Sequence, residues 1–138
     1  MFNKVIINLL ALIYTVGLDY IYLKLIGMRI FQQFLGDLLR KNILLAPGIM
    51  VWVLIVLGSY VFVYDHAIKN IFQALLYGAF YGLVLYGVYE LTNYSILSAW
   101  NSKIVLIDLL WGVILNMLIA LFWHFVGGNG FLKIISKN

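Results

Sequence analysis

Three carboxylic acids stand inside long apolar stretches of this sequence, where an ionisable side chain is costly. They are Asp19, Glu90 and Asp108. An acid in hydrocarbon costs roughly 2.5–3.5 kcal/mol even on lenient insertion scales, so such residues usually face a protein interior and mark proton relays, ion pathways or binding sites. Carboxyl groups held away from water can also act as general acids or bases. These three residues are therefore the first candidates for chemistry in the chain.

The composition indicates a membrane protein. The chain has 138 residues, of which 65% are hydrophobic and 10% are charged, whereas a soluble domain has about 25% charged residues. A helix crosses the hydrocarbon in about 20 residues, so the length leaves room for four spans in one integral membrane domain, residues 1–138. The net charge of +4 does not indicate a nucleic-acid partner, because the basic residues are dispersed along the expected loop ends.

Four apolar stretches predict an all-α membrane protein, with four transmembrane helices in an antiparallel bundle. These stretches cover residues 4–27, 43–64, 71–91 and 103–126. Between the first two, the segment 28–42 places Phe31 and Phe34 on one helical face and Arg29 on the opposite face, which is typical of an amphipathic helix. We expect a short interfacial helix there, lying in the headgroup plane; a cap over the ends of its neighbours is the alternative, and the two are compatible. A glycine-rich segment at 127–131 predicts the end of the fourth helix.

An antiparallel order of the four helices brings the three acids to one side of the membrane. Asp19 and Asp108 then lie on the order of 7–12 Å below the same boundary, at 1.5 Å per residue, and Glu90 is a little shallower. Helical phase also gives each acid polar or small neighbours on its own side. Those neighbours include Tyr22, Tyr86, Asn93 and Gly112. We therefore predict a carboxylate-lined polar pocket in one leaflet.

Acids that share a low-dielectric pocket cannot all be ionised at neutral pH, because mutual repulsion and desolvation both disfavour the charged form. We expect at least one of the three to hold a proton and to donate a hydrogen bond. A simpler alternative for Glu90 is an acid near a helix end that snorkels or bonds to one neighbour. Asp19 and Asp108 have side chains too short to snorkel well, so a buried polar role is favoured for them.

Other candidate features of the sequence favour structural roles. His66 and His124 fall on the opposite membrane face from the acids, and no third ligand lies within reach by spacing, so we expect no metal and no cofactor. Gly78 and Gly82 form a small-xxx-small pair, which is typical of close helix packing.

Parts of the sequence resemble a known family. These parts are GLDYIYLKLIGMRIFQQFLGDLL at 17–39, Pro47 at the start of the second span, and YELTNYSILSAWNSKIVLIDLLWG at 89–112. Together they resemble the bacterial membrane family catalogued as domain of unknown function 2177, over nearly the whole chain. Members of that family more often carry Asp at the position of Glu90 and Trp at the position of Tyr22. Both differences preserve the charge or the aromatic ring.

The resemblance implies a small four-helix, multi-pass protein of the bacterial inner (cytoplasmic) membrane, with no activity assigned to the family. It also implies a set of motif positions near one membrane face. Carried over to this sequence, they are Asp19, Tyr89, Glu90, Thr92, Asn93, Trp100, Asp108, Trp111 and Gly112.

The residues leave three functions open, and whether the protein is an enzyme is open with them. The favoured one is binding of a membrane lipid or amphiphile in the polar pocket, with or without acid–base chemistry on it. The headgroup would meet a basic interfacial rim of Lys24, Arg29, Arg40 and Lys41. The second is proton- or cation-linked transport, for which four short helices make a thin pathway unless the protein forms a homo-oligomer. The third is a structural or assembly subunit whose acids only tie helices together.

Overall fold

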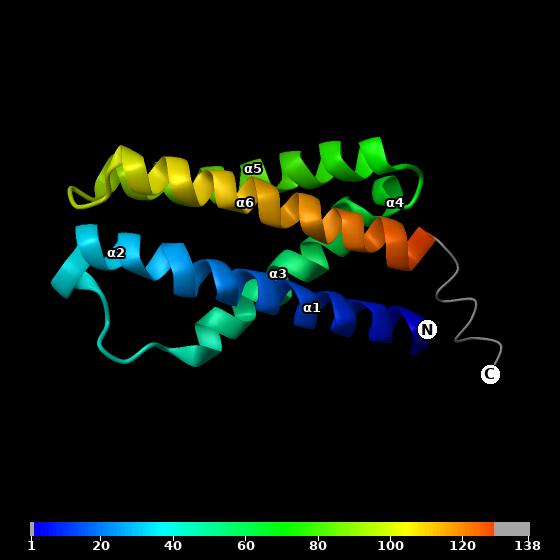
Figure 1. The fold of residues 1–138 in the computed structure, drawn as a ribbon, viewed down its shortest axis with the longest axis horizontal. Coiled ribbons are helices and arrows are strands. Elements are labelled where there is room, and N and C mark those ends of the chain that lie inside the picture. Colours follow the sequence, from blue (N-terminus) through cyan, green and yellow to red (C-terminus); the bar gives the residue numbers. More distant parts are fainter. Residues whose placement is uncertain (1, 129–138) are drawn as a thin grey trace.

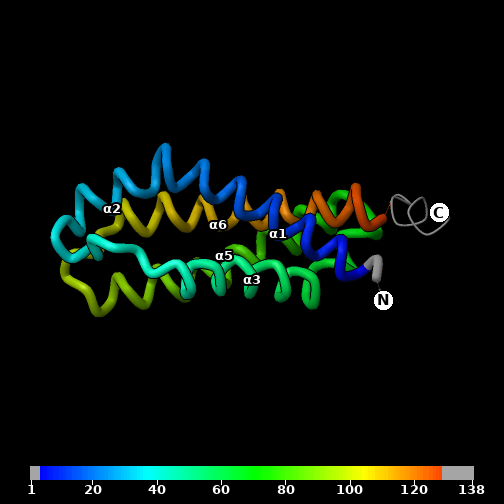
Figure 2. Tube along the Cα trace, turned by 90° about the horizontal axis from the view of Figure 1, so that it is seen from below, coloured from blue at the N-terminus to red at the C-terminus, as the bar shows by residue number. Residues whose placement is uncertain are grey.

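Four long helices make up the protein. The computed structural model describes residues 2–128, with side chains from Lys4 onward, and this part of the chain contains helices and no strands. Four helical stretches are long and apolar enough to cross a membrane, which confirms the predicted fold class. They are Lys4–Leu38, Leu45–Phe62, Ile71–Ile96 and Ser102–Gly128. The four run antiparallel, so the start of the first and the end of the last lie at the same end of the bundle (Figures 1 and 2).

The first span and the amphipathic segment form one continuous helix. Helix α1 (Phe2–Tyr22) passes through a π-helical turn, Leu23–Gly27, directly into α2 (Met28–Leu35). No proline interrupts this stretch. The π-helical turn is wider than an α-helical turn, so it changes the direction in which the following side chains point without ending the helix. The helix ends at Gly36, whose φ of +46° lies in the region that favours glycine, and a 3₁₀ turn closes it at Leu38.

The interfacial helix predicted over 28–42 is therefore helical over its first part only, and it continues in the direction of α1 (Figure 1). Its apolar side packs on the connection between α5 (Ile71–Ile96) and α6 (Ser102–Phe122). The Phe31 ring lies 6.0 Å from the Trp100 ring, and the Lys103 ammonium lies 5.8 Å from the centre of the Phe34 ring. Of the two arrangements expected from the sequence, this one is the cap over the ends of neighbouring helices.

The three helices that follow the first span begin at residues that favour the start of a helix. In α3 (Leu45–Phe62), Pro47 lies in the first turn, where its missing N–H costs little. The side chain of Asn70 caps the start of α5 (Ile71–Ile96) by accepting from the Gln73 amide at 2.8 Å. Asn101 caps α6 (Ser102–Phe122) in the same way, at 2.9 Å from the Lys103 amide. Between α3 and α5 lies the single turn α4 (Tyr64–Ala67).

Helices α5 and α6 both extend beyond their predicted ends. α5 reaches Ile96 rather than residue 91, because neither glycine nor proline occurs between the two positions. α6 continues through a π-helical stretch, Trp123–Gly128. The rest of the glycine-rich segment expected to end it, residues 129–131, lies outside the described residues.

The α5–α6 pair is the most extensive helix contact of the bundle. A Cβ atom added to Gly78 would lie 2.6 Å from the Asn116 carbonyl oxygen, and one added to Gly82 would overlap the Gly112 carbonyl group. The two backbones therefore touch, which is the packing role predicted for the glycine pair. Because Glu90 extends the buried face of α5 and Asp108 belongs to the buried face of α6, this contact also brings the two acids together.

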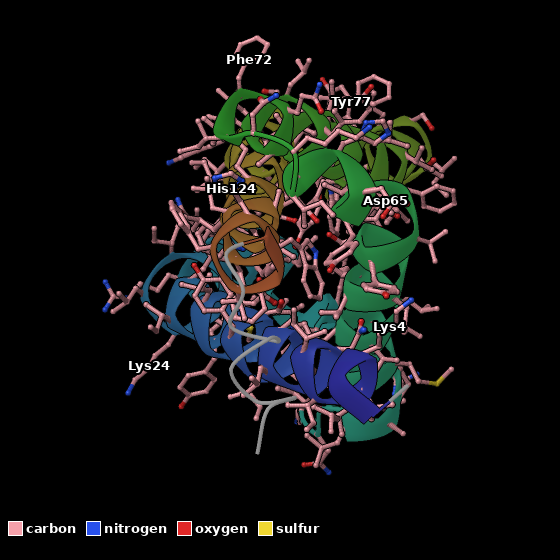
Figure 3. All side chains as sticks on the ribbon, turned by 90° about the vertical axis from the view of Figure 1, so that its right-hand side faces the viewer. Lys4, Lys24, Asp65, Phe72, Tyr77 and His124 are labelled. Atoms are coloured by element: carbon pink, nitrogen blue, oxygen red, sulfur yellow. The ribbon has the colours of Figure 1, made fainter. Side chains whose placement is uncertain are left out.

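The half of the bundle near the chain termini holds the apolar core. Its fully buried members include Ile7, Ala11, Val63, Ala67, Ala74, Leu115, Ile119, Ala120 and Trp123. The histidines belong to this half: His124 Nδ1 lies 2.8 Å from the Ala67 carbonyl oxygen, and the His66 ring stacks on Tyr77 at 3.7 Å. Figure 3 views the molecule from this end, with Tyr77 and Phe72 on the outer side of α5. The three acids lie in the other half.

Cysteine labelling should report this topology directly, since the chain has no native cysteine. Single cysteines replacing Lys4 and Lys69 should react with an impermeant reagent from one side of the membrane, and those replacing Asp37 and Ser98 from the other. All four positions are exposed. Reaction of Lys4→Cys and Lys69→Cys from opposite sides would contradict the antiparallel order of the first two spans.

Candidate functional site

Asp19 ties three helices together. One of its carboxyl oxygens accepts a hydrogen bond from the Trp111 indole N–H and the other from the Trp52 indole N–H, each at 2.8 Å. The acid belongs to α1, and its two partners belong to α6 and α3. Both oxygens of a largely buried acid are thus paired, which offsets much of the cost of its burial.

Asp108 is held by a tyrosine from α1. The Tyr22 hydroxyl donates to Asp108 Oδ1 at 2.9 Å, and both residues are buried. The Tyr22 ring also stacks on the Trp111 indole, with 4.5 Å between ring centres and an angle of 7° between planes. Asp19 and Asp108 therefore border one continuous aromatic surface, since Trp111 is the residue that donates to Asp19.

Glu90 is completely buried, and one of its two carboxyl oxygens accepts a hydrogen bond. The Trp100 indole N–H donates to Glu90 Oε2 at 2.8 Å. Its other oxygen, Oε1, is enclosed and has no N–H or O–H donor among the described residues. The Glu90 and Asp108 side chains lie within hydrogen-bonding reach of each other. Two carboxyl groups can bond in this way only if one of them carries a proton, which would then satisfy the second oxygen.

The donors to these acids are all electrically neutral. Each hydrogen bond described above comes from an indole or a phenol, and none comes from lysine or arginine. Neutral donors stabilise a carboxylate less than an ion pair does. No basic side chain among these donors neutralises the cluster of Asp19, Glu90 and Asp108. Its carboxyl groups are therefore either negatively charged or protonated.

A pocket of about 470 Å³ opens beside this cluster. Its polar floor is formed by Asp19, Asp108 and Tyr22, all largely buried. Its most exposed lining residues are Val51 and Leu54 of α3 and Tyr89 of α5. Leu23, Phe31, Ile55, Leu85, Tyr86 and Trp111 complete the wall. The pocket thus combines an acidic aromatic floor with a largely apolar entrance between α3 and α5.

The site residues predicted from the sequence fall into three groups. Those that line the pocket are Asp19, Tyr22, Tyr86, Tyr89, Asp108 and Trp111. Those that support the lining from behind are Glu90, Trp100 and Gly112, the last because a Cβ there would overlap the Tyr86 ring. Those that lie outside the lining are Thr92 and Asn93, which belong to the last turns of α5.

The basic residues expected at the rim also lie outside the lining. They are Lys24, Arg29, Arg40 and Lys41, and all four are exposed. Lys24 points away from the bundle (Figure 3). The direction of the Lys24 and Arg29 side chains depends on the rotation of the helix that carries them, which their spacing in the sequence does not give.

Sequence reasoning missed Trp52, which closes the Asp19 site. An indole within an apolar run resembles any other membrane-buried aromatic residue. A signal does exist, because Trp52 lies two turns before Ser59 on one face of α3, a face that continues through the buried residues Ile55 and Val56. Ser59 is itself polar and fully buried, and it accepts from the Trp123 indole at 2.9 Å.

These features define a four-helix membrane protein with an acid-floored pocket in one half of the bundle. Comparison with protein families then identifies the group: the model of the family described as "Predicted membrane protein (DUF2177)" matches residues 4–125. The chain belongs to that family. No match was found among curated proteins or solved structures.

Replacing Asp108 should reveal how far the cluster supports the fold. Asp108→Leu removes the acceptor of the Tyr22 hydroxyl and the neighbour of Glu90, and we expect it to lower the free energy of unfolding by about 1–3 kcal/mol. Glu90→Gln should be nearly neutral, because its amide keeps an acceptor for Trp100 and gains a donor toward Asp108. Unfolding of the purified protein in micelles measures both.

Asp37→Leu is the control for this pair, since Asp37 is exposed and lies outside the bundle. It should leave stability unchanged. A Glu90→Gln variant as unstable as Asp108→Leu would mean that the Glu90 carboxyl does not accept or share hydrogen bonds in this arrangement.

Proposed function

We propose that this protein binds a membrane lipid or another amphiphile in the pocket between α3 and α5. The observation that carries the proposal is the combination of a polar floor with an apolar entrance in one cavity. The floor offers Asp19, Asp108 and Tyr22, whereas the entrance offers Val51 and Leu54. An amphiphile has the same division, with a polar headgroup and an apolar chain.

The exposure of the lining supports entry from the side. Leu54 is 64% exposed and Tyr89 is 55% exposed, and both lie on helices long and apolar enough to span the membrane. In a bilayer, such side chains face lipid rather than water. A lipid could thus place its headgroup on the acids while its chain stays among other chains, with little desolvation of the apolar part.

Transport of protons or cations is the less favoured alternative. The acids suit an ion site, but the bundle beyond them holds the apolar core, including Leu115, Ile119 and Trp123. Thr15 and Asn116 lie at intermediate depth, and their side chains bond to carbonyl groups of their own helices. A transport path would therefore require a homo-oligomer or a rearranged bundle, and a purely structural subunit would need no pocket.

The proposal extends to the setting of the protein. We propose membrane lipid as its partner and the bacterial inner membrane as its location, the latter because of the family resemblance. General acid–base chemistry on the bound amphiphile is compatible with this arrangement, since the carboxyl groups of Asp19 and Asp108 line the cavity.

Filling the entrance should displace the amphiphile. We expect Leu54→Trp to reduce the amount of lipid that copurifies with the protein by about tenfold, equivalent to about 1.4 kcal/mol of binding, because the larger ring occupies the mouth of the cavity. Mass spectrometry of lipid extracted from the purified protein measures the loss.

Met50→Trp is the matched control, as Met50 is 62% exposed on the same helix and lies outside the pocket lining. It should retain the lipid. Equal retention by both variants would contradict the proposal, and proton or cation flux through reconstituted vesicles that depends on Asp19 and Asp108 would favour transport instead.

A further inference from the structure

The charges of the pocket suggest which headgroup it accepts. Among the described residues that line it, the charged ones are Asp19 and Asp108, and none is basic. Lys24 and Arg29 are the basic residues that follow Asp19 on the continuous α1–α2 helix. Both are exposed and lie outside the pocket lining. An anionic headgroup in this cavity would meet like charge in a medium of low dielectric constant, where repulsion is strong.

Glu90 adds a third carboxyl group behind the floor. It is 0% exposed, and its side chain reaches Asp108. Within residues 4–128, its Oε1 atom lacks a donor, and the three acids accept hydrogen bonds only from neutral indole and phenol groups. The cluster therefore contains acceptor capacity that the surrounding side chains leave unused, and a cation or a proton would complete it.

The aromatic lining provides the second component of a cation site. Tyr22 and Trp111 stack in parallel beside the two acids, and Phe31, Tyr86 and Tyr89 form further parts of the wall. Aromatic faces attract ammonium groups, and cages of such rings bind quaternary ammonium ligands in particular. Carboxylates and rings converge on the same cavity, and either alone would be a weaker signal.

We propose that the pocket binds amphiphiles that carry a positively charged ammonium headgroup, an inference that rests on the proposed function and specifies its ligand. The ammonium lies between Asp19 and Asp108 and against the Tyr22–Trp111 stack. The attached chain leaves through the entrance at Val51 and Leu54. A free alkylammonium compound and an amine-bearing lipid present the same chemistry to this site.

Brominated probes can test the headgroup preference on the unmodified protein. The full chain is held in uncharged maltoside micelles, and probes with the same bromoalkyl chain carry a trimethylammonium, a sulfate or a maltoside headgroup. Bromine near Trp111 quenches indole fluorescence, so quenching reports occupancy. We expect the trimethylammonium probe to bind about tenfold more tightly than the other two at equal mole fraction in the micelle, a difference of about 1.4 kcal/mol.

Variants then assign the preference to the acids. Asp19→Asn and Asp108→Asn keep the shape of the floor and remove its charge, so they should abolish the advantage of the trimethylammonium probe. Asp37→Asn removes an exposed acid elsewhere and should preserve it. Tetramethylammonium, which lacks the chain, should compete at least about tenfold more weakly, because it leaves the apolar entrance unfilled.

The outcomes separate this inference from the proposed function. Equal binding of the three probes, blocked by Leu54→Trp, would overturn the headgroup preference and keep the amphiphile site. Absence of binding by every probe would overturn both. Competition by tetramethylammonium as strong as that by the alkylated probe would overturn the amphiphile and indicate a site for small cations.

Discussion

The approach of the Glu90 and Asp108 carboxyl groups inside the bundle is the constraint on which the rest of the structure depends. Two acids taken out of water repel each other and lose their hydration, so their burial is costly unless hydrogen bonds and a proton offset it. The glycine-mediated contact between α5 and α6 imposes the approach, because Gly82 allows the two backbones to touch. Trp100 and Tyr22 then supply donors from outside the pair. The packing that holds the helices together therefore also offsets the free-energy cost of burying the carboxyl groups.

The hydrogen bonds of Asp19 and Asp108 connect three of the four long helices, α1, α3 and α6. Asp19 joins α1 to α3 and α6 through Trp52 and Trp111, while Tyr22 joins α1 to α6 a second time. In a membrane, where lipid is as apolar as the helix surfaces, packing and polar contacts of this kind select one arrangement of the helices. The same indole and phenol rings form the pocket wall, so the site has little freedom to change without loosening the bundle. Fold and site are thus one network, and the shape of the pocket is fixed by the packing of the bundle.

The convergence of the acids could be predicted because it follows from two regular quantities, the length of a span and the period of a helix. The pairing of Trp52 with Asp19 could not, since it depends on the rotation of α3, whose outward residues are almost uniformly apolar. The first span was predicted to reach residue 27, but its direct passage into α2 was missed, because a π-helical turn leaves no residue pattern comparable to a proline or a cap. The basic residues near this turn illustrate the same limit. The sequence predicts them at a pocket rim, but the direction of their side chains depends on the rotation of the helix at and after the turn.

The most direct measurement is infrared spectroscopy of the carboxyl stretch across pH, on the purified protein in neutral micelles. The sequence contains five acids in all, of which Asp37 and Asp65 are exposed. A shared proton between Glu90 and Asp108 predicts a protonated-carboxyl band that persists at neutral pH and disappears or shifts in Glu90→Gln. Absence of a protonated-carboxyl band at neutral pH, or a band that Glu90→Gln leaves unchanged, would contradict the shared proton and the buried pair.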